Sequence, residues 1–199
     1  MNRFKKYIGL GITVVFFVLG ILTLPDYGIN WDTINHLPRG QAYLHYYLTG
    51  NKDYSELPPF EKYWQDESTL LFSSDTENVP RRSLYQNDSV PYSWFVENDG
   101  GGHPPTSDII SSFFNYILFQ KLGVINDIDA YRVYGIVVAT ALVYLVYSWT
   151  TKKTNLLGGM VAALSLATYP LFWAESHFNA EKDIPETVFW SFLIYSFYK

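Results

Sequence analysis

Long apolar stretches alternate with one extended polar stretch along this chain of 199 residues. Residues 7–24 include no charged side chain, and about 20 apolar residues in a helix cross the ~30 Å hydrocarbon core of a bilayer. Three further apolar stretches cover residues 131–151, 155–174 and 184–199. This pattern predicts an all-α polytopic membrane protein in which these four stretches are the spans.

A basic flank precedes the first apolar stretch and sets its orientation. Arg3, Lys5 and Lys6 lie directly before it, and the positive-inside rule places such residues in the cytoplasm. A secretory signal peptide begins in the same way, but no small residues typical of a cleavage site follow Leu24. We therefore expect an uncleaved anchor, a cytoplasmic N-terminus and an integral multi-pass protein, in the plasma membrane if the source is bacterial or archaeal.

The polar stretch that follows is acidic. Residues 25–107 contain 12 Asp and Glu against 5 Lys and Arg, a local charge of −7 within a whole-chain charge of −5. Such a loop is expected outside the cytoplasm, and the negative charge argues against nucleic acid as a partner. Aromatic residues reach 19%, which suits membrane–water interfaces, and the absence of cysteine excludes disulfides and thiolate metal sites.

Two segments of the external loop, residues 25–130, are predicted to form helices on the membrane surface. One covers residues 33–48. The other covers residues 106–122, where apolar residues recur at helical spacing but fall short of the roughly 20 that a span needs. If residues 106–122 crossed the membrane, Lys152 and Lys153 would face outward, against the positive-inside rule. We therefore expect an amphipathic surface helix there.

Under this topology the candidate chemistry gathers on the external side of the membrane. It comprises all four histidines and several carboxylates: His36, His45, His103, His177, Asp26, Asp32, Asp99, Glu175 and Asp183. Ionisable groups beside hydrocarbon are costly and mark functional sites. A reaction site at the outer membrane surface would account for them, although helix capping would account for single residues such as Asp32 and Asp183.

Asp32 lies at the expected start of the first surface helix. A carboxylate there can cap unpaired backbone N–H groups, or it can act as a general base toward an acceptor hydroxyl. His36 lies one helical turn later on the same face, and with His45 it could add metal ligands. So few ligands do not make a metal site. No cofactor is therefore predicted, and a divalent metal remains an open alternative.

Two further motifs flank the later apolar stretches. His103-Pro104-Pro105 follows three glycines and opens the second surface helix, so it forms either a simple turn or a place where His103 meets an anionic headgroup. Lys182 and Asp183 come between the third and fourth apolar stretches. There, Asp183 can cap a helix and Lys182 can pair with a phosphate.

In this order the motifs resemble those of GT-C fold membrane glycosyltransferases that use polyprenyl-phosphate sugars, such as protein O-mannosyltransferases and lipid A aminoarabinose transferases. Those families carry an acidic residue in the first external loop, and a His- or Lys-Pro-Pro motif before a surface helix that ends in Leu/Phe-Gly. An Arg-led span and an Asp after the third span follow. The matching residues here are Asp32, His103-Pro104-Pro105, Leu122-Gly123, Arg132 and Asp183.

The resemblance implies transfer of a sugar from a polyprenyl-phosphate donor to an external protein, glycan or lipid acceptor by inverting displacement. Asp32 would be the general base, and His103 would face the donor phosphate with help from Lys182. Asp183 and His36 would shape the site for the acceptor. The lipid phosphate leaves as an anion, so nearby positive groups should lower the barrier.

Two features depart from the family pattern. Asp-Glu is common there where this chain has Asp32-Thr33, and the resemblance does not explain the enlarged loop over residues 51–99. Family members are several times longer, and this chain stops at Lys199 inside an apolar stretch. We therefore expect the N-terminal portion of such an enzyme, which would not be active alone. A non-catalytic membrane protein, such as a transporter fragment or an assembly partner, is the competing interpretation.

Overall fold

The structure is a computed structural model that describes residues 3–28, 30, 32–55, 57, 92–97 and 104–198. Every regular element in these ranges is a helix, and the chain is an all-α membrane protein, as its apolar pattern predicts. It divides into two compact units. The bundle unit comprises residues 1–29 and 132–199, and the loop unit comprises residues 30–131.

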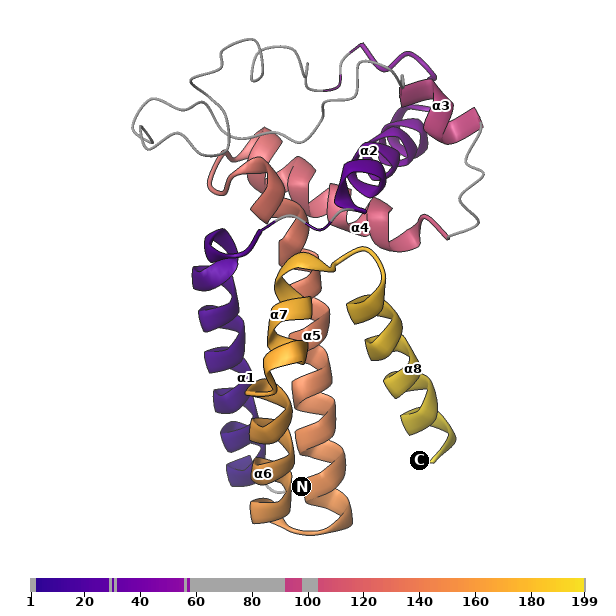
Figure 1. Cartoon of the computed structure of the whole chain (residues 1–199). Coiled ribbons are helices and arrows are strands. Elements are labelled where there is room, and N and C mark those ends of the chain that lie inside the picture. Colours follow the sequence, from indigo (N-terminus) through magenta and orange to yellow (C-terminus); the bar gives the residue numbers. More distant parts are fainter. Residues whose placement is uncertain are drawn as a thin grey trace. The chain divides into compact units, whose positions relative to one another are not determined.

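The bundle unit contains the helices that can cross a membrane (Figure 1). Its elements are α1 (Arg3–Thr23), the 3-10 turn η1 (Leu24–Asp26), α5 (Asp127–Lys153, of which the first five residues belong to the loop unit), α6 (Leu156–Ala167), α7 (Pro170–Phe178) and α8 (Asp183–Phe197). Within the described ranges, α1 with η1 and α5 are each long and apolar enough for a span. A third span is added if α6 and α7 form one broken helix. The 15 residues of α8 fall short of a full crossing.

α1 and α5 run antiparallel along the bundle unit. Near one end the Tyr147 hydroxyl donates to the Lys5 carbonyl at 2.5 Å. Further along, Ile136 packs so closely on Gly20 that a Cβ there would lie 3.0 Å from its side chain. The basic start of α1 and the Lys152-Lys153 pair at the end of α5 therefore lie at the same end of the unit.

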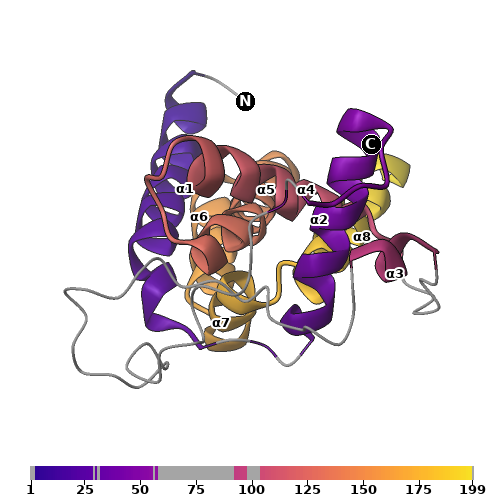
Figure 2. The same cartoon turned by 90° about the horizontal axis from the view of Figure 1, so that it is seen from above.

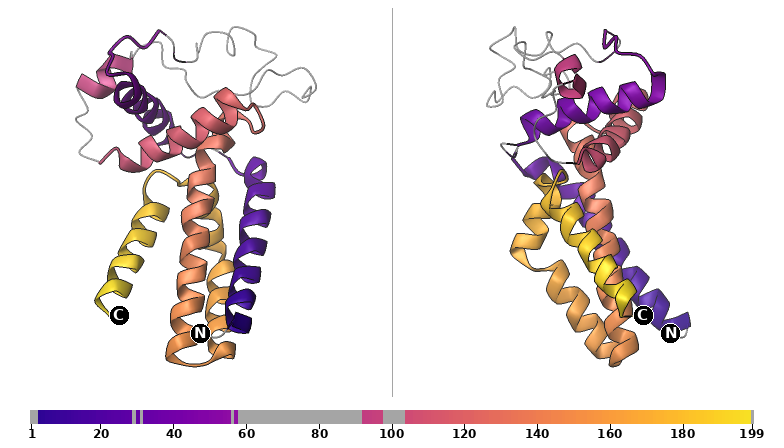
Figure 3. Two further views of the ribbon diagram at one scale, coloured as in Figure 1. Left: turned by 180° about the vertical axis from the view of Figure 1, so that it is seen from behind. Right: turned by 90° about the vertical axis from the view of Figure 1, so that its right-hand side faces the viewer.

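The third segment is bent because its backbone hydrogen bonding is interrupted. Asn155 begins α6 by accepting the Gly158 N–H at 2.9 Å, a normal N-cap. Pro170 starts α7 at a position where its missing N–H costs nothing. The axes of α6 and α7 differ by 57°, and the bend between them is plain in Figure 3.

The loop unit is built from α2 (Thr33–Thr49), α3 (Tyr92–Glu97), α4 (Thr106–Asn115) and a π-helical turn, η4 (Tyr116–Lys121). α2 packs against both α3 and α4 (Figure 2). It ends at Thr49 and is capped by Gly50, which has a φ of +68° and whose N–H donates to the Tyr46 carbonyl at 2.8 Å. Gly40 brings α2 and α4 close together, since any Cβ there would overlap with the Asp108 carbonyl.

α4 turns its polar side toward α2. Asp108, Ser111, Ser112 and Asn115 are buried, whereas the Phe113 side chain on the apolar side is 46% exposed. A helix lying on a membrane has this arrangement, because its apolar side can enter the bilayer while its polar side packs on protein. The position of α4 on the membrane surface stays a prediction.

Candidate functional site

Asp32 occupies the N-cap position of α2, and its side chain makes no capping hydrogen bond. Its own N–H donates to Asn30 Oδ1 at 3.3 Å, and its carbonyl accepts the His36 N–H at 3.1 Å. The helix start is thus formed by the backbone. The capping explanation of this carboxylate, which the sequence left open, does not hold.

His36 belongs to a buried ion cluster with Arg39 and Asp108. Asp108 is 1% exposed, and its carboxylate accepts from His36 Nδ1 at 3.0 Å and from Arg39 Nε at 2.6 Å. The second guanidinium nitrogen, Nη2, also lies 2.6 Å from Asp108 Oδ2. A carboxylate withdrawn from water needs such compensation. The cluster therefore fixes α2 against α4.

This cluster changes the chemistry expected of His36. The guanidinium of Arg39 lies against the ring, with Nη2 at 3.1 Å from Nδ1, and a fixed positive charge disfavours a metal cation there. Within the ranges that the structure describes, no group of three or more His, Asp or Glu residues could hold a metal ion. Arg39 follows His36 at helical spacing, but no local motif points to Asp108, which lies 72 residues after His36.

An amide network occupies the other end of the α2–α4 contact; it comprises Gln41, Asn115, Gln120, Asp127 and Tyr131. Gln41 Nε2 donates to the Tyr131 hydroxyl at 2.7 Å, and Asn115 Nδ2 donates to the Asp127 carbonyl at 2.9 Å. The π turn η4 brings Gln120 Nε2 within 2.8 Å of Asn115 Oδ1. These hydrogen bonds offset the cost of burying most of the polar groups in the network.

His45 lies apart from the ion cluster, among tyrosine rings. Its ring centroid is 5.3 Å from that of Tyr54, which is in turn 6.0 Å from that of Tyr92. Burial, with a smaller effect from the Asp127 carboxylate, raises the pKa of the Tyr92 hydroxyl far above its usual value. Tyr92 therefore stays neutral at any physiological pH.

The polar connector before α8 is organised by one amide. Asn179 Nδ2 donates to Glu175 Oε2 at 2.8 Å and to Asp183 Oδ2 at 2.6 Å. Asp183 is the first residue of α8 and Lys182 takes the N-cap position, with no side-chain capping bond. Capping of this helix is one of the roles that the sequence leaves open for Asp183. Asp183 instead lies in the first turn, where a carboxylate favours the helix dipole.

The chain leaving α1 is held by an exit cluster of Thr23, Tyr27, Gly28, Arg132 and His177. Arg132 Nη1 donates to the Tyr27 carbonyl at 3.1 Å, and Nη2 donates to the Gly28 carbonyl. The His177 ring is fully buried and stacks on the Tyr27 ring at a centroid distance of 4.2 Å. His177 was predicted to lie on the external side of the membrane, which stays a prediction; in the bundle unit its side chain is buried.

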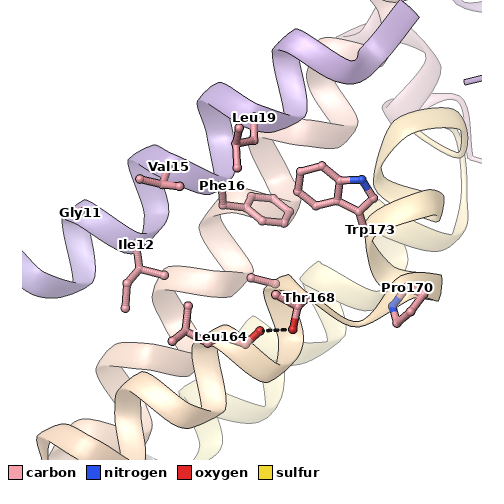
Figure 4. A pocket seen from close by; sticks show the side chains of 10 residues that line it. Gly11, Ile12, Val15, Phe16, Leu19, Leu164, Thr168, Pro170 and Trp173 are labelled. Atoms are coloured by element: carbon pink, nitrogen blue, oxygen red, sulfur yellow. Dashed lines mark hydrogen bonds between the residues drawn. The ribbon is translucent and has the colours of Figure 1, made fainter. Parts of the chain in front are cut away.

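An apolar groove of about 630 Å³ runs between α1 and the α6–α7 bend (Figure 4). Its lining side chains are Ile12, Val15, Phe16, Leu19, Leu164, Ala167, Thr168, Pro170 and Trp173, with Gly11 between them. The Phe16 and Trp173 rings meet edge to face at 5.2 Å across the groove. Its volume is within the range of small-ligand sites, and its lining suits a hydrocarbon chain.

One predicted site residue, His103, lies outside the described residues, as does most of the enlarged loop over residues 51–99. The other predicted residues are divided between the units: Asp32 and His36 belong to the loop unit, and Lys182 and Asp183 to the bundle unit.

Residues 102–199 match the family model described as dolichyl-phosphate-mannose-protein mannosyltransferase. The matched segment begins next to His103-Pro104-Pro105 and contains Arg132 and Asp183. It confirms the resemblance drawn from these motifs: residues 102–199 are similar to GT-C mannosyltransferases. No curated protein and no solved structure shows a significant match to the chain.

Proposed function

We propose that this protein takes part in the transfer of a sugar from a polyprenyl-phosphate donor to an extracytoplasmic protein, glycan or lipid acceptor. The observation that carries this proposal is the mannosyltransferase family match over residues 102–199. The helical membrane architecture supports it, because a donor with a long hydrocarbon chain must be bound from within the bilayer.

The proposed reaction is a single inverting displacement. The oxygen of an acceptor hydroxyl forms a bond to the anomeric carbon, and the bond from that carbon to the phosphate oxygen breaks. The polyprenyl phosphate leaves with the electron pair as an anion. The carboxylate of Asp32 takes the proton of the acceptor hydroxyl as general base. Glycosidases that retain configuration use two displacements and a second carboxylate instead.

The other predicted residues take supporting roles in this proposal. His103 and Lys182 offer positive charge to the leaving phosphate. Asp183, tied to Asn179, shapes the acceptor side of the site. His36 shapes the site from the inside, because its bond to Asp108 fixes the helix that begins at Asp32.

We also propose that the loop unit lies on the extracytoplasmic side. The shared basic end of α1 and α5 supports this orientation under the positive-inside rule. Since the chain has no cysteine of its own, single cysteines can be placed at Ser55 and Thr154. A membrane-impermeant thiol reagent added to intact cells should label Ser55→Cys and spare Thr154→Cys. Labelling of Thr154→Cys from outside would contradict the proposed topology.

The general base is tested by Asp32→Asn in the full-length protein. Loss of a general base is expected to lower kcat by about 10²–10⁴-fold, measured as transfer of radiolabelled sugar from polyprenyl phosphate. Asp53→Asn is the matched control, since Asp53 is an exposed carboxylate of the same unit and should leave the rate unchanged. Normal turnover by Asp32→Asn, with wild-type amounts of protein in the membrane, would remove Asp32 from the mechanism.

A further inference from the structure

We propose that Arg132 and His177 are positioning residues that clamp the chain where it leaves α1. Neither is a proton donor or a phosphate ligand in this assignment; both act through Tyr27 and Gly28 on the segment that leads to Asp32. The expected effect on catalysis rests on the proposed function. The clamp itself does not, because Arg132, His177, Tyr27 and Gly28 all belong to the bundle unit.

Arg132 supplies the first half of the clamp. It is 4% exposed, and two of its guanidinium nitrogens donate to the consecutive carbonyls of Tyr27 and Gly28. A planar guanidinium holds two acceptors in fixed directions, whereas a lysine ammonium is a point charge on a flexible stem. Arg132 therefore fixes the orientation of the peptide units that follow α1.

His177 supplies the second half. Its ring lies between the rings of Tyr27 and Trp173, at centroid distances of 4.2 Å and 4.7 Å. Nδ1 lies 2.6 Å from the Trp173 carbonyl and Nε2 lies 2.9 Å from the Thr23 hydroxyl. Since a carbonyl only accepts, Nδ1 donates to Trp173, while the Thr23 hydroxyl beside Nε2 itself donates to the Leu19 carbonyl at 2.8 Å. Both ring nitrogens are thus used inside the protein.

The two halves converge from different parts of the sequence on one short segment. Arg132 is the first residue of α5 that belongs to the bundle unit, and His177 lies at the end of α7. Only four peptide steps separate Gly28 from Asp32, a reach of about 14 Å even when fully extended. Holding Gly28 therefore limits the positions that the Asp32 carboxylate can sample, and small misplacements of a catalytic group are costly to rate.

The local part of the proposal is tested with a spin label on a single cysteine at Asp26, an exposed residue beside the clamp. In detergent-solubilised protein, Arg132→Gln and His177→Ala should each raise the mobility of the label at least about twofold. Tyr27→Leu removes the stacking but keeps the His177 side chain in place, and it should also raise the mobility of the label. This variant keeps the test valid if His177→Ala fails to fold. A label at Ser196, near the end of α8, is the matched control and should not change. Unchanged mobility at position 26 in all three variants would overturn the clamp.

The catalytic part is tested by kinetics of Arg132→Lys and His177→Gln. A positioning role predicts a kcat lowered about tenfold or more, a donor KM changed by less than about twofold, and a pH–rate profile of unchanged shape. A donor KM raised with kcat unchanged would make Arg132 a phosphate ligand, and loss of one limb of the pH profile would make His177 an acid or base. Either result would overturn the proposal. If the full-length wild-type protein transfers no sugar, the proposed function fails while the spin-label result still decides the clamp.

Discussion

The apolar centre of the bundle unit contrasts with the polar contact between α2 and α4 in the loop unit. The centre of the bundle unit is apolar, with Phe16, Leu142, Val143 and Phe172 in its core. The α2–α4 contact of the loop unit is formed by charged and amide groups, while apolar Phe113 stays half exposed. A polar helix side is expected to face water, yet on α4 it is the buried side. Next to a lipid bilayer, the polarity of a helix side therefore does not predict which side packs against the rest of the protein.

The largest test of this contrast removes the central carboxylate of the loop unit. Asp108→Ala leaves the Arg39 guanidinium buried without its carboxylate, a change that costs about 3–5 kcal/mol. Amide hydrogen exchange in α2 and α4, measured in detergent micelles, should accelerate accordingly. Asp53→Ala, an exposed carboxylate, serves as the control and should leave exchange in α2 unchanged. Equal protection in Asp108→Ala and the wild type would mean that the ion cluster does not hold the helices together.

The second test asks whether the stability of the bundle unit depends on close packing between its helices. Gly9 and Gly11 are two residues apart in α1, but a Cβ on Gly9 would overlap with the Tyr147 ring, whereas Gly11 faces open space in the groove. We expect Gly9→Leu to lower the free energy of unfolding by about 3 kcal/mol, and Gly11→Leu to change it by less than ~0.5 kcal/mol. Thermal unfolding of both variants in the same detergent compares them. Equal melting temperatures would contradict the assigned packing.

A third variant tests the amide network without removing a charge. Asn115→Leu is close in volume, but it leaves the amide of Gln41 and the carbonyl of Asp127 with one partner fewer. Unsatisfied buried groups of this kind cost about 2 kcal/mol. Denaturant unfolding should place this variant between Asp108→Ala and the wild type. A variant as stable as the wild type would show that the network can be replaced by apolar packing.

The smallest effect is expected at an exposed helix end of the bundle unit. Asn155→Ala removes the side chain that accepts the Gly158 N–H and should destabilise α6 by about 1 kcal/mol. Asn155→Ser keeps an acceptor at this position, and its melting temperature should stay closer to that of the wild type. A loss as large as that of Gly9→Leu would mean that capping, and not packing, dominates this unit.

The fold class could be predicted from the sequence because it depends on local patterns. Uncharged stretches mark the spans, and helical spacing marks the segments that became α2 and α4 with η4. The side of α4 that is buried could not be predicted. Ser111, Ser112 and Asn115 have the polarity of a solvent-exposed side, yet they are buried. The structure explains this by the close approach of α4 to α2 at Gly40, where a side chain would not fit.

The candidate site could be predicted only where a motif is continuous in sequence. Asp32 and the Pro-Pro motif stand out locally. The partners of His36 and His177 do not, because Asp108 follows His36 by 72 residues and His177 follows Thr23 by 154. Contacts of this range depend on how helices pair, and the composition of either segment alone does not specify them.

The π turn η4 has a consequence for how this chain is compared with others. It contains more residues per turn than the α-helix before it. The spacing of 3.6 residues per turn that applies from Thr106 therefore no longer places residues on the same helix face between Tyr116 and Lys121. An alignment with a relative that has a continuous α-helix here must open a gap of about one residue. Without that gap, Gln120 would be aligned about 100° away from its true helix face, and its role as a partner of Asn115 would be assigned to the wrong residue.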